Sequence, residues 1–268
     1  MKLISINIGI KIDNSKKIGE FIKSQKPDFV AFQEIVRHFD ESVFDMYKSK
    51  SRIERVIKEK LPYSFFGPLW ITNAMRNNGK MHRDFNGFVE QGNEVVSKFP
   101  IINATNEHYY KNYSLELEWA NFHAEDHPRA VQIVELNVND KKLQIINLHG
   151  LYSKDKQDSE RTISQCEYVL NTTKRNDIPT IIVGDFNLFP NTESIQILSQ
   201  EFRNLIDEYN IMSTRPDFND GTDVGNNVVD YIFVNDKIKV NNFKAFNTNI
   251  SDHLPLILDF EIIDRKEA

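Results

Sequence analysis

The sequence contains very little cysteine and carries no excess of basic residues. Its single cysteine, Cys166, excludes an internal disulfide and any metal site built from several thiolates. The formal net charge is −6 at pH 7, whereas a protein whose affinity comes from neutralising many phosphates is normally basic. No apolar run reaches the roughly 18 residues of a membrane span. These absences favour a small substrate, or phosphate binding by a metal ion and a few local cations.

The 268 residues include 40% apolar residues and 19 Phe, enough for a substantial core. No internal repeat, linker or composition break divides the chain, so we expect one domain over residues 1–268. The opening "MKLISINIGIKID" has the alternation of a first strand and lacks the features of a signal peptide. We therefore expect a cytoplasmic monomer with no membrane span.

Short apolar segments alternate with helical patterns along the chain. Strands are predicted at 3–8, 29–33, 63–68, 93–97, 131–138, 143–148, 180–183, 228–234, 240–246 and 254–262. Helices are predicted at 15–24, 42–59, 159–175, 192–199 and 205–209. Two long loops, 70–92 and 112–128, are interpreted as a substrate rim because of their aromatic and basic residues: Trp70, Arg76, Lys80, His82, Arg83 and Trp119.

Polar side chains stand where several of these strands end. In "FVAFQE", the period of two places Glu34 on the same side as Val30 and Phe32, and in "QIINLHG" it places His149 beside Asn147. We interpret each polar group as the open end of an inward-facing row, which predicts a site at one end of the sheet core. The complete set is Asn7, Glu34, His149, Asp185, Asn187, Asp230, Asp252 and His253.

This mixture of carboxylates, amides and imidazoles indicates a hard divalent cation. Mg²⁺ or Mn²⁺ suits it, because Mg²⁺ takes one or two protein carboxylates and completes its shell with water and substrate phosphate. A catalytic zinc site would usually bring two or three histidine ligands, often closely spaced, whereas His149 and His253 are far apart in the sequence and each lies beside carboxylates or amides. It also lacks the G-x-S-x-G, G-x-x-x-x-G-K-[ST] and G-x-G-x-x-G motifs of other hydrolases and nucleotide-binding proteins.

The motifs "SINIG", "FQE", "NLHG", "GDFN", "VDYIF" and "SDHLPL" occur in this order over nearly the whole chain. In these motifs the chain resembles the endonuclease/exonuclease/phosphatase family of metal-dependent phosphoesterases. The family includes deoxyribonucleases, abasic-site endonucleases, deadenylases, inositol-polyphosphate phosphatases, sphingomyelinases and tyrosyl-DNA phosphodiesterases. The resemblance implies a four-layer α/β sandwich, in which two mixed β-sheets pack face to face with helices on the outside.

The resemblance also implies roles for the residues around the metal and the nucleophile. Glu34 would be the principal metal ligand, and Asn7 would support the metal site and the nucleophile. Asp185 would orient or deprotonate the attacking water, and Asn187 would hold the phosphate with its amide. Asp252 would serve a second or alternative metal position.

Four further residues would act on the phosphate and the leaving group. The resemblance implies that His253 contacts the phosphate and that Asp230 orients it. It places His149 near the leaving group, and it makes Arg129, in "HPRAV", a contact of the phosphate. An inactive binding relative on the same fold is the less favoured reading, because this set of polar residues is intact.

Two departures argue against an abasic-site endonuclease: Gly9 replaces an Asp, and "NLHGLY" replaces a motif with Tyr and Asn. The additional substrate-binding signatures of the inositol phosphatases are not evident. We expect a metal-dependent hydrolase of nuclease type, with a phosphatase or a phospholipid phosphodiesterase acting on a small substrate as the alternative. A nucleic-acid substrate would be single-stranded or an end, with bases stacking on Trp70 and Trp119.

Overall fold

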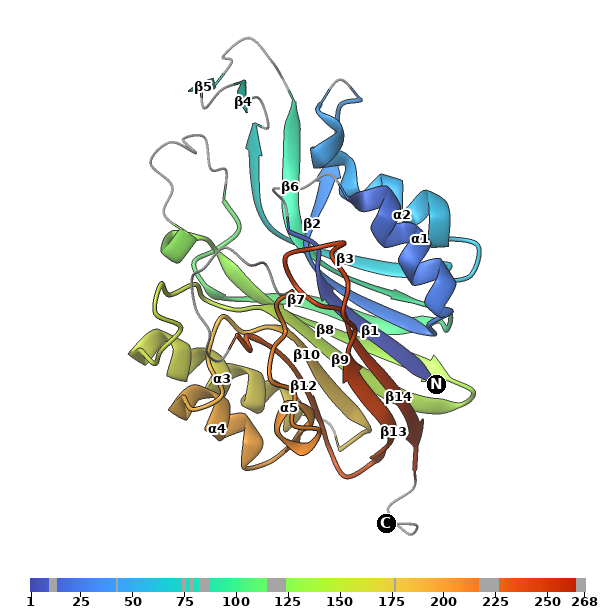
Figure 1. The fold of residues 1–268 in the computed structure, drawn as a ribbon, viewed down its shortest axis with the longest axis vertical. Coiled ribbons are helices and arrows are strands. Elements are labelled where there is room, and N and C mark those ends of the chain that lie inside the picture. The colour runs from blue at the N-terminus through green and yellow to red at the C-terminus, as the bar shows by residue number, and fades with distance from the viewer. Residues whose placement is uncertain are drawn as a thin grey trace.

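Two six-stranded sheets, each with parallel and antiparallel pairs, pack face to face between helices (Figure 1). The computed structural model describes residues 1–9, 14–41, 43–73, 76–77, 80–81, 87–114, 124–175, 177–216 and 227–263. In the order of the first sheet, the strands are β13 (Ile238–Ala245), β14 (Leu256–Ile262), β1 (Lys2–Asn7), β2 (Phe29–His38), β6 (Phe88–Ser97) and β3 (Tyr63–Asn73). In the second sheet they are β11 (Arg203–Asn204), β12 (Asp230–Val234), β10 (Thr180–Asp185), β9 (Lys141–His149), β8 (Arg129–Val138) and β7 (Ile101–Tyr110).

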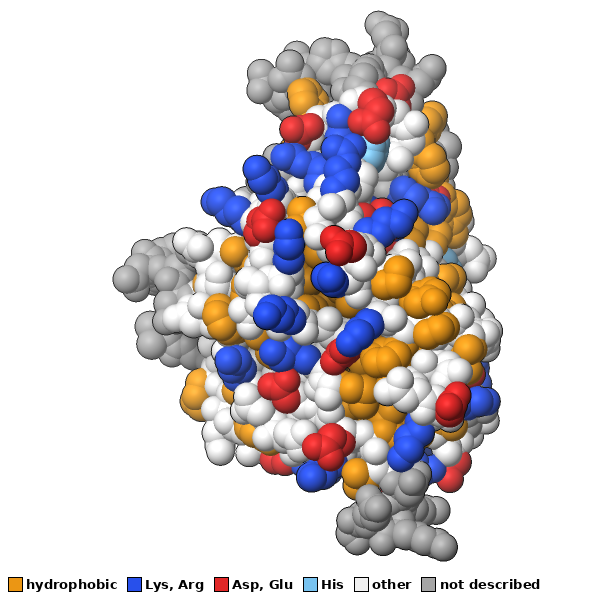
Figure 2. Space-filling view, turned by 90° about the vertical axis from the view of Figure 1, so that its right-hand side faces the viewer, with side chains coloured by type: hydrophobic (Ala, Val, Ile, Leu, Met, Phe, Trp, Pro, Cys, Tyr) orange, Lys and Arg blue, Asp and Glu red, His pale blue; other side chains and the backbone are white. Residues whose placement is uncertain are grey.

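Helices α1 (Ser15–Gln25) and α2 (Ser49–Ile57) cover the outer face of the first sheet. Their apolar sides, including Ile18, Ile22 and Ile53, share a buried cluster with Val30 and Phe32 of β2. Their outer sides carry Lys and Arg with some Asp and Glu between them, as Figure 2 shows for this face of the molecule. This division into an apolar side and a charged side is typical of helices that pack on a sheet with one face and meet solvent with the other.

The second sheet carries α3 (Glu160–Thr173), α4 (Glu193–Ser199) and α5 (Leu205–Glu208). The two sheets and their helices form four layers, which confirms the expected α/β sandwich. Among the described residues, no helix has both the length and the apolar character needed to cross a bilayer. The other short elements among the described residues are the pair β4 (Arg76–Asn77) and β5 (Lys80–Met81) and the 3-10 turns Asp45–Lys48 and Ala124–Asp126.

Polar side chains link the two sheets inside the core. Gln33 Nε2 donates to Asn147 Oδ1 at 2.8 Å, and Asn147 Nδ2 donates to Gln132 Oε1 at 3.1 Å. All three side chains are fully buried. Because Gln33 precedes Glu34 in β2 and Asn147 lies near the end of β9, this layer fixes the two sheets beside the edge where the predicted site lies.

The predicted loop 70–92 is wrong at both ends, because β3 continues to Asn73 and β6 begins at Phe88. We predicted a stop at Pro68, but β3 is an edge strand, where the missing proline N–H is tolerated and the register shifts locally. Trp70 is 1% exposed and its ring packs edge-on against His127, so its placement on a substrate rim was wrong. Outside the described residues lie His82, Arg83, Trp119 and the side chains of Arg76 and Lys80.

Two other predictions need correction. Strand β7 was missed, because its sequence "IINATNEHYY" is largely polar and the strand lies at the edge of its sheet with most side chains partly exposed. The single helix predicted at 42–59 is instead the 3-10 turn Asp45–Lys48 followed by α2.

Candidate active site

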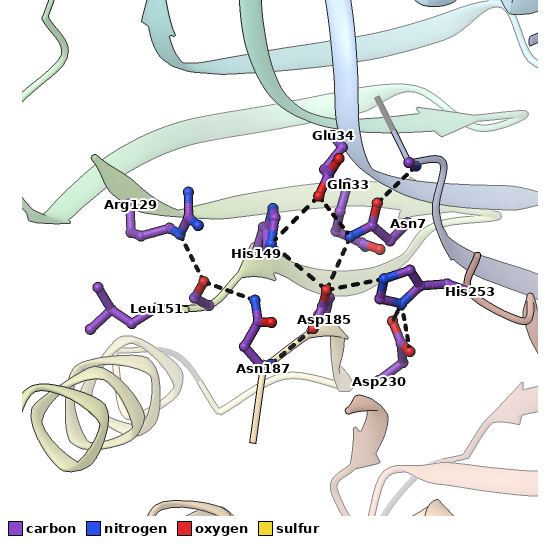
Figure 3. A network of polar contacts seen from close by, with 12 residues as sticks. Asn7, Gln33, Glu34, Arg129, His149, Leu151, Asp185, Asn187, Asp230 and His253 are labelled. Carbon is purple, nitrogen blue, oxygen red and sulfur yellow. Dashed lines mark hydrogen bonds and ion pairs between the residues drawn. The ribbon is translucent and has the colours of Figure 1, made fainter. Parts of the chain in front are cut away.

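Polar residues from both sheets meet at one edge of the sandwich (Figure 3). Asn7 ends β1, while His149 and Asp185 end the parallel neighbours β9 and β10. Asp230 begins β12, which runs antiparallel to β10, so it lies directly beside Asp185. The carboxyl ends of parallel strands and the start of an antiparallel one share an edge, which explains how residues so distant in sequence converge.

Glu34 reaches this edge by a route that the sequence analysis had wrong. Val30 and Phe32 face α1 and α2 on the outside of the first sheet, so an undistorted strand would direct Glu34 outward as well. The pairing of β2 with β6 shifts between Phe32 and Ile35, and Glu34 has a left-handed backbone with φ 57°. This local bulge turns the carboxylate toward Asn7 and His149, and such irregularities are frequent beside functional sites.

Asn7 bridges the two sheets through its side-chain amide. Its Nδ2 donates to Asp185 Oδ2 at 3.0 Å and to Glu34 Oε1 at 3.3 Å, while its Oδ1 accepts from Gly9 N at 3.0 Å. The side chain is fully buried. Asn7 therefore holds the two carboxylates in place with its only donor group.

His253 lies between two buried carboxylates. Its Nδ1 contacts both oxygens of Asp230, at 3.0 and 2.9 Å, and its Nε2 lies 3.6 Å from Asp185 Oδ2. Burial by itself would lower the pKa of His253, but Asp230 and Asp185 outweigh burial and raise that pKa to about 9. Burial would raise the pKa of Asp185, yet the positive charge of His253, with Arg215 and Lys156 as further cations, holds it below its usual range. His253 is thus an imidazolium beside an ionised Asp185.

His149 lies on the other side of Asp185 and has the opposite charge state. Its Nε2 is 3.7 Å from Asp185 Oδ2 and 3.9 Å from Glu34 Oε1. Burial, with the positive charge of Arg129 as a second cause, lowers the pKa of His149 well below its usual value. The site therefore combines a neutral imidazole with a charged one, as the positions of Arg129 and Asp230 require.

A glycine determines the backbone conformation at the end of β10. Gly184 has φ 146°, and a Cβ there would lie 1.9 Å from the carbonyl oxygen of Leu148, so no other residue fits the G of "GDFN". Asn187 has φ 57°, and its backbone N–H donates to Asp185 Oδ1 at 2.8 Å. Arg129 Nε at 2.7 Å and Asn187 Nδ2 at 3.3 Å both donate to the carbonyl oxygen of Gly150. This shared acceptor places Arg129, Asn187 and Asp185 in one connected group (Figure 3).

Asp252 lies apart from the centre of this group. Its carboxylate is paired with Arg215 Nη1 at 3.2 Å and accepts from Ser251 Oγ at 3.3 Å, and its side chain is 46% exposed. It approaches the group at Gly9, where a Cβ would lie 2.4 Å from Asp252 Oδ1, and through Ser251, whose Oγ also donates to the carbonyl oxygen of Asn7 at 2.7 Å. Its predicted role at a second metal position stays a prediction.

Two cations of this region were not found from the sequence. Lys156 Nζ donates to Asn187 Oδ1 at 2.6 Å, and Arg215 pairs with Asp252. Lys156 belongs to the polar stretch "YSKDKQD", where nothing distinguishes it from a surface lysine. Only the fold brings it to Asn187.

The model of the Endonuclease/Exonuclease/phosphatase family matches residues 4–253, which is nearly the whole chain. The chain belongs to the endonuclease/exonuclease/phosphatase family. No curated protein sequence is similar enough to the chain to be counted as a relative.

Solved structures of the endonuclease/exonuclease/phosphatase fold resemble the chain at low sequence identity. One is an endonuclease/exonuclease/phosphatase from Beutenbergia cavernae, with TM-score 0.73 and 14% identity over 98% of this chain and 72% of that one. The mannosyl-6-phosphatase Bt3783 of Bacteroides thetaiotaomicron has TM-score 0.68 and 16% identity, covering 98% of this chain and 100% of that one. Truncated TDP2 from Caenorhabditis elegans has TM-score 0.66 and 14% identity, covering 97% and 96%. These similarities show the fold.

The donor atoms at the site fit the divalent cation that this family uses. Glu34 offers a hard carboxylate that is 20% exposed, next to the amide of Asn7. Within the described chain, Asp185, Asp230 and His253 also place ligand atoms within 4.8 Å of one another. We favour an ion pair there, because Nδ1 of His253 already contacts both oxygens of Asp230. The role of Glu34 as a metal ligand stays a prediction.

Proposed function

We propose that this protein hydrolyses a phosphoric ester by attack of water on phosphorus, with Mg²⁺ or Mn²⁺ as cofactor. The observation that carries the proposal is the ionised Asp185 between an imidazolium, His253, and a neutral imidazole, His149. Glu34, supported by Asn7, would hold the cation. When bound, a divalent cation supplies Lewis-acid stabilisation of a phosphoryl oxygen and lowers the pKa of water.

Asp185 is suited to orienting the attacking water. Its carboxylate is 2% exposed and is held by Asn7 Nδ2 and by the backbone N–H of Asn187, so its direction is fixed. Its depressed pKa makes it a weak proton acceptor but a constant hydrogen-bond acceptor at neutral pH. We assign it the positioning of the water, since a fixed geometry removes much of the entropic barrier to attack.

His253 and Arg129 supply positive charge to the phosphoryl oxygens. His253 is kept charged by Asp230, and Arg129 is 3% exposed and directed by the carbonyl oxygen of Gly150. Cations fixed in a water-poor site stabilise developing charge more than the same groups in water. His149 directs Nε2 toward Asp185 and Glu34, and we assign it to the leaving oxygen.

If the substrate were a nucleic acid, its bases were expected to stack on Trp70 and Trp119. Trp70 is buried, so that part of the expectation fails. The solved structures of similar fold include a mannosyl-6-phosphatase as well as TDP2. A small phosphate ester is therefore at least as well supported as a nucleic acid.

A substrate panel tests the proposal. Phosphomonoesters, phosphodiesters and single- and double-stranded nucleic acids would be incubated with the protein and Mg²⁺ or Mn²⁺. We expect hydrolysis of at least one class, and a loss of about 100-fold or more in kcat for Asp185→Asn, a variant with nearly unchanged shape. Asp185→Asn with wild-type turnover would remove Asp185 from the reaction.

A further inference from the structure

The loop between β9 and α3 carries a lysine into the site. Lys156 has a left-handed backbone with φ 57°, and its carbonyl oxygen accepts from Phe189 N at 3.0 Å. This bond fastens the loop to the segment that follows Asn187 and directs the lysine side chain inward. A charged residue in a strained conformation that the fold holds in place is frequently functional.

The ammonium group of Lys156 has only neutral partners. Nζ donates to Asn187 Oδ1 at 2.6 Å and lies 4.0 Å from the centre of the Tyr152 ring. Within the described chain, Nζ forms no ion pair with a carboxylate. Burial lowers the pKa of Lys156 to about 8, although Asp185 opposes the shift, so the group is mostly charged at neutral pH.

Arg129 shares this property. Its guanidinium is buried and donates to the carbonyl oxygens of Gly150 and Pro128. Burying a charge is costly unless an opposite charge compensates it. Two cations, Arg129 and Lys156, thus converge on Asn187 and Gly150, and their hydrogen-bond acceptors among the described residues are neutral. This arrangement is suited to receiving an anion.

A groove of about 780 Å³ lies beside this loop. Its walls are formed by the loop, by the start of α3 and by Glu125, and they include Leu151, Tyr152, Ser153, Ser159 and Arg161. Tyr152 both lines the groove and lies under Lys156 Nζ, so its ring connects the groove to the cation. The volume is that of a small-molecule site, on the order of 300–1,000 Å³, and it is too small for a duplex.

We propose that Lys156 binds a phosphoryl oxygen of the substrate and that Tyr152 and the groove receive the alcohol part of a small phosphomonoester. The inference rests on the proposed phosphoesterase function and selects its small-substrate form. The net charge of the site supports the choice of a monoester. The ion pairs His253–Asp230 and Arg215–Asp252 are each neutral. The positive charges of Arg129 and Lys156 equal in number the negative charges of Glu34 and Asp185. With a divalent cation bound, the site therefore has a net charge of +2. A phosphomonoester dianion neutralises this charge fully, whereas a diester, with one negative charge, neutralises half of it.

Binding of inorganic phosphate, measured by calorimetry with Mn²⁺ present, tests Lys156 without requiring turnover. Lys156→Met should weaken phosphate binding about 10-fold, because a charge-assisted hydrogen bond is lost, and Lys156→Arg should stay within about threefold. The matched control is Lys142→Met, an exposed lysine at the opposite end of β9, which should bind as the wild type does. Equal phosphate affinity for Lys156→Met and the wild type would overturn the inference.

Tyr152→Ala tests the groove separately. This variant should bind inorganic phosphate like the wild type but bind p-nitrophenyl phosphate about 10-fold more weakly. The control is Tyr63→Ala, which removes a tyrosine that is 41% exposed and lies in β3, outside the groove, and it should change neither affinity. The wild type should also prefer p-nitrophenyl phosphate to bis(p-nitrophenyl) phosphate by about 10-fold or more in kcat/KM. Unchanged ester binding by Tyr152→Ala, or a preference for the diester, would contradict the inference. Failure of the wild type to hydrolyse any ester would instead refute the proposed function, while the binding measurements still decide on Lys156 and Tyr152.

Discussion

Replacing Asn7 by Asp perturbs the bridge between the two sheets with almost no change in shape. The amide Nδ2 that donates to Asp185 Oδ2 at 3.0 Å and to Glu34 Oε1 at 3.3 Å becomes a carboxylate oxygen. At an effective dielectric constant of about 20, each new repulsion amounts to about 5 kcal/mol. The total loss of stability is limited because the new carboxyl group can take up a proton instead. Protonating an aspartate at about pH 7.5 costs about 5 kcal/mol. We therefore expect Asn7→Asp to lose about 3–5 kcal/mol of unfolding free energy in the absence of metal.

Urea denaturation in EDTA at about pH 7.5 measures this loss. Asn7→Ala is the control, because it removes the same hydrogen bonds without adding charge and should cost about 1–3 kcal/mol. Addition of Mn²⁺ should stabilise Asn7→Asp more than the wild type, because a third carboxylate then faces the cation. Equal stability of Asn7→Asp and Asn7→Ala in EDTA would show that the added charge is not repelled by Asp185 and Glu34. Equal stabilisation of Asn7→Asp and the wild type by Mn²⁺ would show that position 7 does not face the cation.

Three further predictions concern charged side chains. Glu34→Ala should weaken Mn²⁺ binding by at least about 10-fold, whereas Asp185→Asn should keep metal binding and lose turnover; equal loss of metal affinity in calorimetry would contradict these separate roles. The double variant Asp230→Ala/His253→Ala should be scarcely slower than His253→Ala alone, and multiplicative losses in kcat would separate the pair. Burial raises the pKa of Glu94 from 4.5 to about 7, although Lys50 opposes the shift. The contribution of Glu94 to the free energy of unfolding is therefore fully present below about pH 4.5 and is lost as the pH rises through about 7. Glu94→Gln should remove about 3 kcal/mol of this pH dependence in urea titrations between about pH 5 and 8, and an unchanged dependence would show that Glu94 is ionised throughout.

The strand-end motifs predicted which residues meet at the edge of the sheets, and the reason is regular geometry. His149 and Asp185 end parallel neighbours in register, so the period of two and the strand boundaries were sufficient to place them. For Glu34 the period of two indicated the wrong face. The side chains of Val30 and Phe32 face the helices, and the bulge between Phe32 and Ile35 turns Glu34 toward the site instead. A one-residue irregularity of this kind leaves no distinct trace in an alternating pattern.

The surroundings of the site could not be predicted because they depend on tertiary contacts. Trp70 follows Gly67 and Pro68, which indicated the end of a strand, yet the edge position lets β3 continue and packs the indole inside. Lys156 stands in a polar loop, and its approach to Asn187 depends on the loop's bond to Phe189 N. Residues placed by loop packing of this kind carry no periodic signal.

The most direct test of the central claim is the hydrolysis of p-nitrophenyl phosphate by metal-free protein, to which Mn²⁺ or Mg²⁺ is then added back. We expect no turnover in excess EDTA, recovery on adding the divalent cation, and a recovered turnover at least about 100-fold lower for Asp185→Asn. In water enriched in ¹⁸O, the released phosphate should carry one solvent oxygen, as attack of water on phosphorus requires. Full hydrolysis in excess EDTA, or phosphate without solvent oxygen, would contradict the central claim.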